Sequence, residues 1–257
     1  MKIGICGDIV QAQSAIGMGY DYAEFHLAKL TALPDDEFEQ LARERERLAI
    51  PIESFNCFCP SNIRLTAGVD ETELSAYAEK AFSRAARLGG ELSVVGSGRS
   101  RAIPEGYDAA KARDEFKRAL SLVEKIASRH GIRLALEPLC RGDTNFVNTL
   151  AEAAEICAEI GSENIGCVVD LFHFGQNGED MGDVVRYGRH IIHTHLARSS
   201  DDRYIPAAGD IDHVRPFFDA LAAIGYKGRM SLEGRYHPDF NESIAAAMGL
   251  FKLLGIK

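Results

Sequence analysis

Short apolar runs alternate with longer amphipathic runs along the whole chain, and this alternation constrains the fold more than any other feature. Runs typical of strands cover residues 2–6, 21–26, 52–56, 92–96, 132–137, 165–170, 190–196 and 229–233. Helical patterns follow them at 9–18, 35–48, 71–88, 108–129, 149–160, 180–188, 213–224 and 239–254. Such alternation is typical of a parallel sheet covered by helices. Eight units in 257 residues predict one α/β domain, residues 1–257, folded as a closed (β/α)8 TIM barrel.

Residues at the ends of the predicted helices agree with these boundaries. Asp108 and Thr149 stand where N-cap side chains accept backbone N–H groups. Gly89-Gly90, Gly131 and Gly161 follow helices directly, at positions where a left-handed C-cap residue is common. The local signals therefore support the same order of elements as the apolar pattern.

Four consecutive strands in the second half each end on a residue that can bind a metal. These residues are Glu137, Asp170, His195 and Glu233, and 33, 25 and 38 residues separate them, about one strand–helix unit each. The carboxyl ends of the strands of a closed barrel meet at one rim, so we expect the four side chains to converge. Each alone has a simpler explanation, such as a solvated acid, an N-cap or a core histidine. Their succession favours a metal site, with His193 as an inward-facing neighbour of the ligand His195.

The predicted donor set is rich in oxygen, with two glutamates, one aspartate and one histidine. Hard divalent cations prefer such donors, whereas structural zinc sites are usually built from cysteine and histidine. We therefore expect one divalent metal, with Mn²⁺ as the first choice and Mg²⁺ or Co²⁺ as alternatives.

Composition argues against several other classes of protein. The net charge of −9 lacks the basic surface that binds nucleic acid. No apolar stretch approaches the length of a membrane span, so no membrane partner is expected. Six cysteines, with no secretion signal after Met1, predict reduced thiols and a cytoplasmic location.

Motifs from Leu136 onward carry a resemblance to a known group of barrels. They read Leu136-Glu137-Pro138, Asp170-Leu171-Phe172-His173, His193-Thr194-His195 and Leu232-Glu233-Gly234, with a further stretch over residues 203–212. With these motifs the chain resembles the xylose-isomerase-like barrel superfamily. Within it, the chain looks most like the ketose 3-epimerase group (tagatose and allulose 3-epimerases), with hydroxypyruvate isomerases and inosose dehydratases nearby. The resemblance covers the whole length.

The resemblance implies an enzyme in which the four strand-end residues hold the metal. It further implies that Glu137 and Glu233 are the acid/base pair of an epimerase or isomerase that forms an enediolate. Epimerisation removes a proton from one face of a carbon and returns it on the other, so two carboxylates must flank the substrate. A metal next to the carbonyl would stabilise the negative charge that develops there.

The resemblance also implies which residues contact the substrate, expected to be a small carbohydrate. His173 and Arg203 match the histidine and arginine that hold sugar oxygens in the family. Asp143 stands where the epimerases usually carry a substrate-contacting glutamate, and we expect it at the substrate too. The aromatic first loop of the allulose enzymes is absent, and the chain has no tryptophan. We expect a homodimer or a homotetramer.

Other functions on the same scaffold stay open at this point. The nearest is a metal-dependent lyase or dehydratase acting on a keto-cyclitol or a 3-keto-glycoside, which begins with the same proton abstraction. An abasic-site endonuclease is disfavoured, because the third and fourth predicted strands do not end on the extra histidines that its three-metal cluster requires. A non-catalytic sugar-binding barrel would leave the two glutamates unexplained.

Two segments outside these motifs also invite a functional interpretation. Cys57 and Cys59 are too few for a zinc site, so we expect them to be small packing residues near the substrate. Residues Gly96 to Arg101 follow the fourth predicted strand and could grip a phosphate through backbone N–H groups and Arg99. Because they match no phosphate motif, a flexible rim loop is the preferred interpretation.

Overall fold

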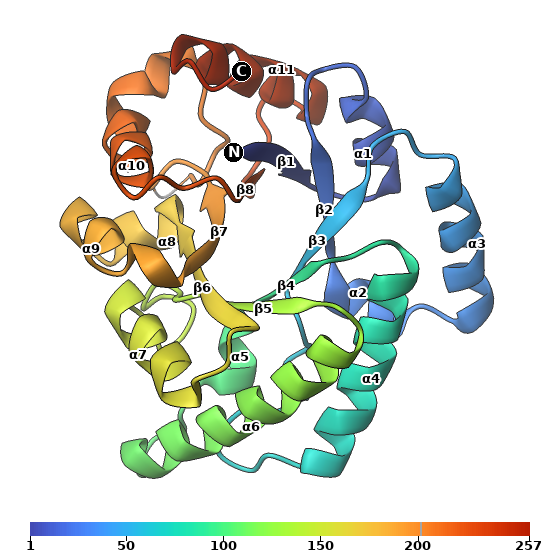
Figure 1. Ribbon diagram of the computed structural model, residues 1–257, viewed down its shortest axis with the longest axis vertical. Coiled ribbons are helices and arrows are strands. Elements are labelled where there is room, and N and C mark those ends of the chain that lie inside the picture. The colour runs from blue at the N-terminus through green and yellow to red at the C-terminus, as the bar shows by residue number, and fades with distance from the viewer. Residues whose placement is uncertain (201) are drawn as a thin grey trace.

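Eight parallel strands form a closed barrel in a computed structural model that describes residues 1–200 and 202–257. Neighbouring strands follow the order of the chain, and β1 also pairs with β8 to close the barrel (Figure 1). The predicted TIM barrel is confirmed. The strands are β1 Lys2–Cys6, β2 Tyr22–His26, β3 Ile52–Asn56, β4 Leu92–Val95, β5 Arg133–Leu136, β6 Ile165–Asp170, β7 Ile191–Leu196 and β8 Arg229–Leu232.

Helices surround the barrel, and the predicted ones are present with ends shifted by a few residues. Three short helices that begin within three residues of a strand end were not predicted, because the apolar run of the strand leads into them with no separate periodic pattern. The predicted helices are α1 Ile9–Ala15, α3 Asp35–Glu46, α4 Glu71–Arg87, α6 Ala109–Arg129, α7 Leu150–Ile160, α9 Met181–Arg186, α10 Ile211–Ala223 and α11 Phe240–Leu253. The short ones are α2 Leu27–Ala32, α5 Gly98–Arg101 and α8 Leu171–Gln176, and two 3₁₀ turns cover Gly188–His190 and Ala208–Asp210.

Side chains at the helix ends explain why the helices begin and end where they do. Thr149 and Glu152 form a capping box at the start of α7, and Asp108 accepts the N–H of Lys111 at the start of α6. Gly161 ends α7 in the left-handed conformation, with φ of 69°. Of the predicted glycine pair after α4, only Gly89 has a positive φ, so the prediction for Gly90 was wrong.

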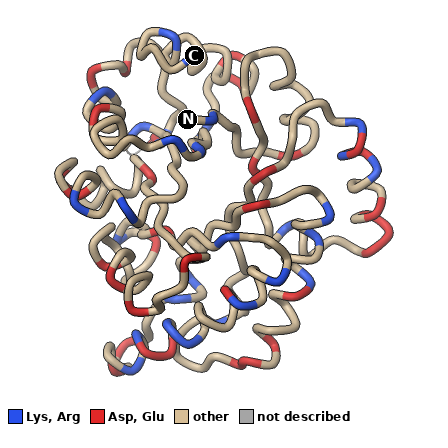
Figure 2. Tube along the Cα trace, viewed as in Figure 1, with Lys and Arg blue, Asp and Glu red and all other residues tan. Residues whose placement is uncertain are grey.

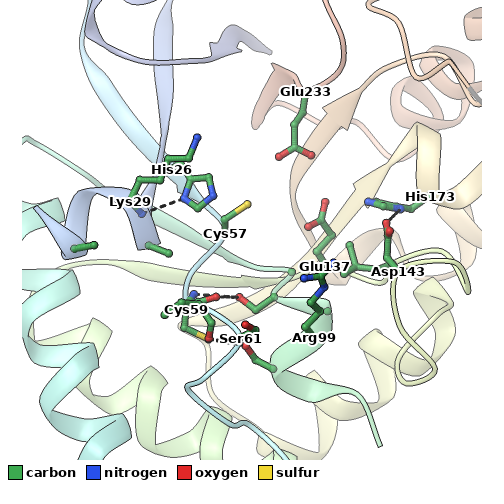
Figure 3. Close-up of a pocket in the computed structure, with 18 of the residues that line it drawn as sticks. His26, Lys29, Cys57, Cys59, Ser61, Arg99, Glu137, Asp143, His173 and Glu233 are labelled. Carbon is green, nitrogen blue, oxygen red and sulfur yellow. Dashed lines mark hydrogen bonds and ion pairs between the residues drawn. The ribbon is translucent and has the colours of Figure 1, made fainter.

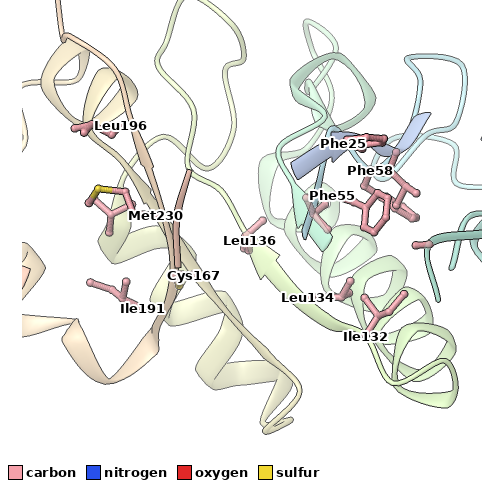
Figure 4. Close-up of a cluster of buried hydrophobic side chains, with 14 of the residues drawn as sticks. Phe25, Phe55, Phe58, Ile132, Leu134, Leu136, Cys167, Ile191, Leu196 and Met230 are labelled. Carbon is pink, nitrogen blue, oxygen red and sulfur yellow. The ribbon is translucent and has the colours of Figure 1, made fainter. Parts of the chain in front are cut away.

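Apolar side chains fill the layer between the barrel and its helices. Figure 4 shows part of it, with Phe55 and Phe58 at β3 and Leu134 and Leu136 on β5. A second, smaller apolar cluster is made of Leu92, Val94, Ala135 and Val168, which lie on β4, β5 and β6. Close packing of both clusters fixes the strands and, with them, the side chains at the rim.

The part of the barrel next to β1 and β2 contains polar side chains. The ring of Tyr22 covers Gly4, where an added Cβ would lie only 2.4 Å from the ring. The Tyr22 hydroxyl is 2.6 Å from the Ser231 hydroxyl, and the Ser231 hydroxyl donates to the buried carboxylate of Glu24 at 2.5 Å. The barrel interior therefore contains a polar network next to β1 and β2 and the apolar cluster of Leu92, Val94, Ala135 and Val168 next to β4, β5 and β6.

Charged residues of both signs are spread over the outer helices, as α3 shows in Figure 2. At the amino ends of the strands, Glu53 accepts hydrogen bonds from Lys2 Nζ and Arg229 Nε, each at 2.6 Å, and Arg229 also pairs with Glu91. None of the helices in the described part of the chain has the length and apolarity needed to span a bilayer.

Candidate metal centre and active site

The four predicted ligand residues converge at the carboxyl rim of the barrel. One donor atom from each of Glu137, Asp170, His195 and Glu233 lies within 4.8 Å of the others. Asp170 and His195 are level on β6 and β7, because a register shift after Cys167 brings them opposite each other. Glu137 and Glu233 follow the last residues of β5 and β8, so all four side chains are held by strand ends.

His195 lies at the centre of this cluster. Its Nδ1 is 3.0 Å from Glu137 Oε1, 3.2 Å from Glu233 Oε2 and 3.9 Å from Asp170 Oδ2. Asp170 uses its other oxygen to accept the N–H of Phe172 at the start of α8. The donors are therefore fixed before any ligand arrives, and their carboxylate and imidazole atoms fit a hard divalent cation.

The carboxylates draw positive charge into the site. Arg203 Nη2 lies 2.9 Å from Asp170 Oδ2 and 2.7 Å from Glu233 Oε2. Burial alone would raise the pKa of Glu233, but His195 and Arg203 outweigh it and lower that pKa well below its usual range. Burial likewise opposes the charged form of His195, yet Glu233 and Glu24 raise its pKa well above the usual value. A cation that binds Nδ1 must then displace a proton.

Glu24, which no sequence motif indicated, contacts both histidines on the side away from the cluster. Its Oε1 is 3.1 Å from His195 Nε2, and its Oε2 is 2.8 Å from His193 Nε2, with all three side chains fully buried. Burial disfavours the charged form of Glu24, but the two imidazoles lower its pKa well below the usual value. Because Glu24 contacts Nε2 of His195, Nδ1 points into the cluster. His193 has the inward-facing position that was predicted.

The three predicted sugar contacts lie around the cluster. The backbone N–H of Cys140 donates to His173 Nδ1 at 3.1 Å, so His173 carries its proton on Nε2, which is 3.8 Å from Asp170 Oδ2. Asp143 Oδ2 is 3.7 Å from His173 Nδ1. The guanidinium of Arg203 lies 4.6 Å from the centre of the Phe172 ring.

A cavity of about 670 Å³ opens above Glu137 and Glu233. Figure 3 shows His173 and Asp143 on one of its sides and His26 and Lys29 on the opposite side. Its walls also come from the loops after β3 and β4 and from Arg203. The volume and the mixed polar lining suit a small polar molecule.

Cys57 and Cys59 line this cavity as free thiols. Cys59 is buried, and its Sγ lies 3.5 Å from Ser100 Oγ. Burial raises the pKa of both thiols above the usual value, so they are poor nucleophiles at neutral pH. This agrees with the prediction of small packing residues near the substrate.

The segment Gly96 to Arg101 is not the irregular loop that was expected. Its last four residues form the one-turn helix α5, and Arg101 is fully buried. Arg101 Nη2 donates to the carbonyl oxygens of Glu137 at 2.8 Å and Val147 at 3.2 Å, and burial lowers its pKa to about 10. Both carbonyl groups belong to the loop after β5, and the sequence does not show that they lie next to Arg101. Their hydrogen bonds hold the segment in one conformation.

Two further residues that the sequence did not indicate position the glutamates. Asn56 Nδ2 donates to Glu233 Oε1 at 2.6 Å. Gly96 faces Glu137, where an added Cβ would lie 2.5 Å from Glu137 Oε2. Both lie at the carboxyl ends of early strands. A glycine or an asparagine is common at such a position for structural reasons, so neither residue indicates a functional site from sequence.

The fold and the site define a class, a (β/α)8 barrel with a carboxylate–imidazole cluster at its carboxyl rim. The family model for the xylose isomerase-like TIM barrel matches residues 12–254. The chain belongs to this family, as its motifs predicted.

Sequence relatives and solved structures agree with the resemblance to sugar epimerases. L-ribulose 3-epimerase of Mesorhizobium japonicum is 30% identical over 149 residues, 56% of this chain and 49% of the relative. 3-Dehydro-D-guloside 4-epimerase of Escherichia coli is 30% identical over 118 residues, 46% of this chain and 44% of the relative. The chain thus spans about half the length of these curated relatives. A D-psicose 3-epimerase structure in the presence of D-fructose has a TM-score of 0.83 at 19% identity, covering 98% of each chain, and shows a shared fold.

Proposed function

We propose that this protein is a divalent-metal-dependent epimerase or isomerase of a ketose or a related keto-sugar. The observation that carries the proposal is the pair Glu137 and Glu233, which reach the same cavity from β5 and β8 on either side of His195. Two carboxylates that approach one small molecule from different strands are what proton removal and return on opposite faces require. The names of the sequence relatives, both epimerases of sugars, support the same reaction type.

The cluster of Glu137, Asp170, His195 and Glu233 would hold the metal, with Mn²⁺ expected and Mg²⁺ or Co²⁺ as alternatives. When bound, such an ion stabilises the negative charge that develops on substrate oxygens during proton abstraction. Three carboxylates around one imidazole provide the oxygen-rich donor set that these ions prefer.

The surrounding residues would hold the substrate and prepare the two bases. His173 offers its Nε2 proton to a sugar oxygen, since Cys140 occupies Nδ1. Arg203 and Asp143 face the same cavity and can bind further hydroxyl groups. Asn56 and Arg203 each bind one oxygen of Glu233, which fixes the position of that carboxylate in the site.

The test is proton exchange in D₂O with Mn²⁺-loaded protein and the probes L-ribulose and D-psicose, followed by NMR. We expect deuterium at a carbon next to the carbonyl together with an epimeric product. Glu137→Gln and Glu233→Gln should each lower net turnover by ~10²–10⁴-fold, the range for general acid/base catalysis. Each variant should still exchange the proton of one epimer, a different one in each case, through the glutamate that remains.

Two controls make the result decisive. Elemental analysis must show that both variants keep the metal, because a lost metal would mimic a lost base. Loss of water from inosose probes in place of epimerisation would support the lyase alternative. Wild-type turnover in both metal-loaded glutamine variants would overturn the proposed mechanism.

A further inference from the structure

A second cavity, of about 390 Å³, adjoins the candidate active site at the carboxyl rim. It is lined by residues of α1, α2, the middle of α3 and the ends of β2 and β3, and it shares His26 and Lys29 with the first cavity. In Figure 3 these two residues lie on the side of the first cavity that faces away from Asp143 and His173. A molecule bound at the metal cluster therefore has room to extend past them.

Large apolar side chains make up five of the eleven residues that line this second cavity, and Lys29 and His26 lie where it meets the first cavity. The polar residues at its α1 side, Asp8 and Gln11, bind each other's backbone: Asp8 Oδ1 accepts the N–H groups of Val10 and Gln11, and Gln11 Oε1 accepts the N–H of Asp8. A dry cavity of ~150 Å³ is enough to bind benzene, so this one can take an aromatic ring or a short alkyl chain. The apolar residues are Ile9, Phe25, Leu30, Leu33 and Leu41.

Asn56 links this cavity to the chemistry. It lines the second cavity, is 8% exposed, and donates through Nδ2 to Glu233 Oε1 at 2.6 Å. A carboxylate oxygen only accepts, so the amide orientation is fixed and Oδ1 is the free atom. Within residues 1–200 and 202–257, Oδ1 is buried without a hydrogen-bond partner. A buried acceptor of this kind is satisfied by an O–H or N–H group of a ligand.

We propose that the second cavity binds an apolar aglycone, so that the substrate is a keto-glycoside and not a free ketose. The sugar ring would lie at the metal cluster, a hydroxyl group next to the glycosidic bond would donate to Asn56 Oδ1, and the aglycone would lie among Leu33, Leu41 and Phe25. This inference rests on the proposed function and narrows its substrate class.

The probes are methyl and phenyl 3-keto-β-D-glucopyranosides, with deuterium exchange by the Mn²⁺-loaded protein as the readout. Wild type should show a kcat/KM for the phenyl glycoside ~10–100-fold above that for the methyl glycoside, the range for added apolar groups in a fitted pocket. In Leu41→Gln the kcat/KM for the phenyl glycoside should exceed that for the methyl glycoside by no more than about threefold. Leu33→Gln is the second variant if Leu41→Gln does not fold. Val10→Gln is the matched control, because Val10 is 69% exposed and lies outside the cavity lining.

A second readout separates this inference from the proposed function. Saturation-transfer NMR with phenyl β-D-glucopyranoside, which cannot react, measures binding without turnover. If no keto-sugar is processed, the proposed function fails, but phenyl contact that is lost in Leu41→Gln still supports the cavity. Equal kcat/KM for the two glycosides, a ratio unaffected by Leu41→Gln, or a change of oligomeric state in that variant would each overturn the inference.

Discussion

Gly96 is the residue at which the smallest change should have the largest effect. An alanine Cβ there would lie 2.5 Å from Glu137 Oε2, the free end of a side chain that can rotate away. Gly96→Ala should therefore leave the unfolding free energy within about 1 kcal/mol of wild type but lower kcat by at least ~10²-fold, because a displaced base no longer reaches the substrate.

The check is thermal unfolding together with proton exchange on the same samples. Gly249→Ala is the matched control, because Gly249 lies in α11 with no atom near an added Cβ. It should keep full activity and raise the unfolding free energy by ~0.5–1 kcal/mol. Normal exchange in Gly96→Ala would show that the position of Glu137 is not critical.

Glu24 should control metal affinity without touching the metal. Glu24→Gln keeps the size of the side chain but removes the charge that orients His195 through Nε2. We expect Mn²⁺ affinity, measured by titration calorimetry, to fall ~10–100-fold. Glu124→Gln is the control, since Glu124 is another buried carboxylate, on α6, that accepts from Ser162 away from the cluster. Unchanged affinity in Glu24→Gln would reduce Glu24 to a purely structural residue.

At this scale the residues at the strand ends could be predicted from sequence, whereas the residues that support them could not. Glu137, Asp170, His195 and Glu233 were found because strand ends converge in any parallel barrel. Glu24 was missed because it lies inside an ordinary buried strand, and its contact with His195 exists only once the barrel closes.

At the scale of single elements, the start of α7 shows how a neighbouring loop can make stability depend on pH. Glu179 Oε2 accepts the N–H of Leu150 at 2.7 Å. Burial raises the pKa of this carboxyl group from its ordinary value of 4.5 to about 7. The folded protein therefore holds the proton more tightly than the unfolded chain. This contribution to stability is complete below pH 4.5 and is lost as the pH rises through about 7.

Glu179→Gln should remove that dependence, because the amide keeps an oxygen for Leu150 and cannot ionise. The difference in unfolding free energy between variant and wild type should be ~1 kcal/mol more favourable to the variant at pH 8 than at pH 5. This figure is reduced because the group is partly exposed to solvent. Urea unfolding at the two pH values measures this difference, with Glu105→Gln on an exposed loop as the baseline. Parallel pH profiles for wild type and Glu179→Gln would contradict it.

The long helices could be predicted, whereas the short helices directly after strands could not. Helices such as α4 and α6 have enough turns for an apolar stripe to repeat, whereas α2, α5 and α8 have one or two turns each. Arg101 shows the consequence. An arginine in a loop is usually solvated, and only the tertiary structure shows that it holds the carbonyl of Glu137.

At the scale of the whole molecule, the ion-pair network at the amino ends of the strands should stabilise the closed barrel. Burial opposes the charge on Glu53, but Lys2 and Arg229 outweigh it and lower its pKa, so its contribution is present at neutral pH and is lost as the pH falls through the lowered pKa. Glu53→Gln should lower the unfolding free energy by ~1–3 kcal/mol at pH 7 and leave proton exchange unchanged, because the network lies at the end of the barrel away from the cavity.

Denaturant unfolding provides the measurement. Glu46→Gln is the control, since Glu46 pairs with Arg87 on the surface at 3.2 Å and should cost less than about 1 kcal/mol. If both variants lose the same small amount, the network is no stronger than an ordinary surface pair.

The barrel itself was predictable because eight repeats of one pattern leave few other ways to bury the apolar runs. What fills its interior was not, because the polar network around Glu24 and the apolar cluster around Val94 both come from strands that look alike in sequence.

The candidate metal cluster comes entirely from β5 to β8, whereas most of the wall that faces it comes from the loops after β2, β3 and β4. Under the proposed function, the early loops would contact the part of the substrate that lies away from the reacting carbon. Substitutions in these loops would then change which molecule binds and leave the cluster of β5 to β8 intact.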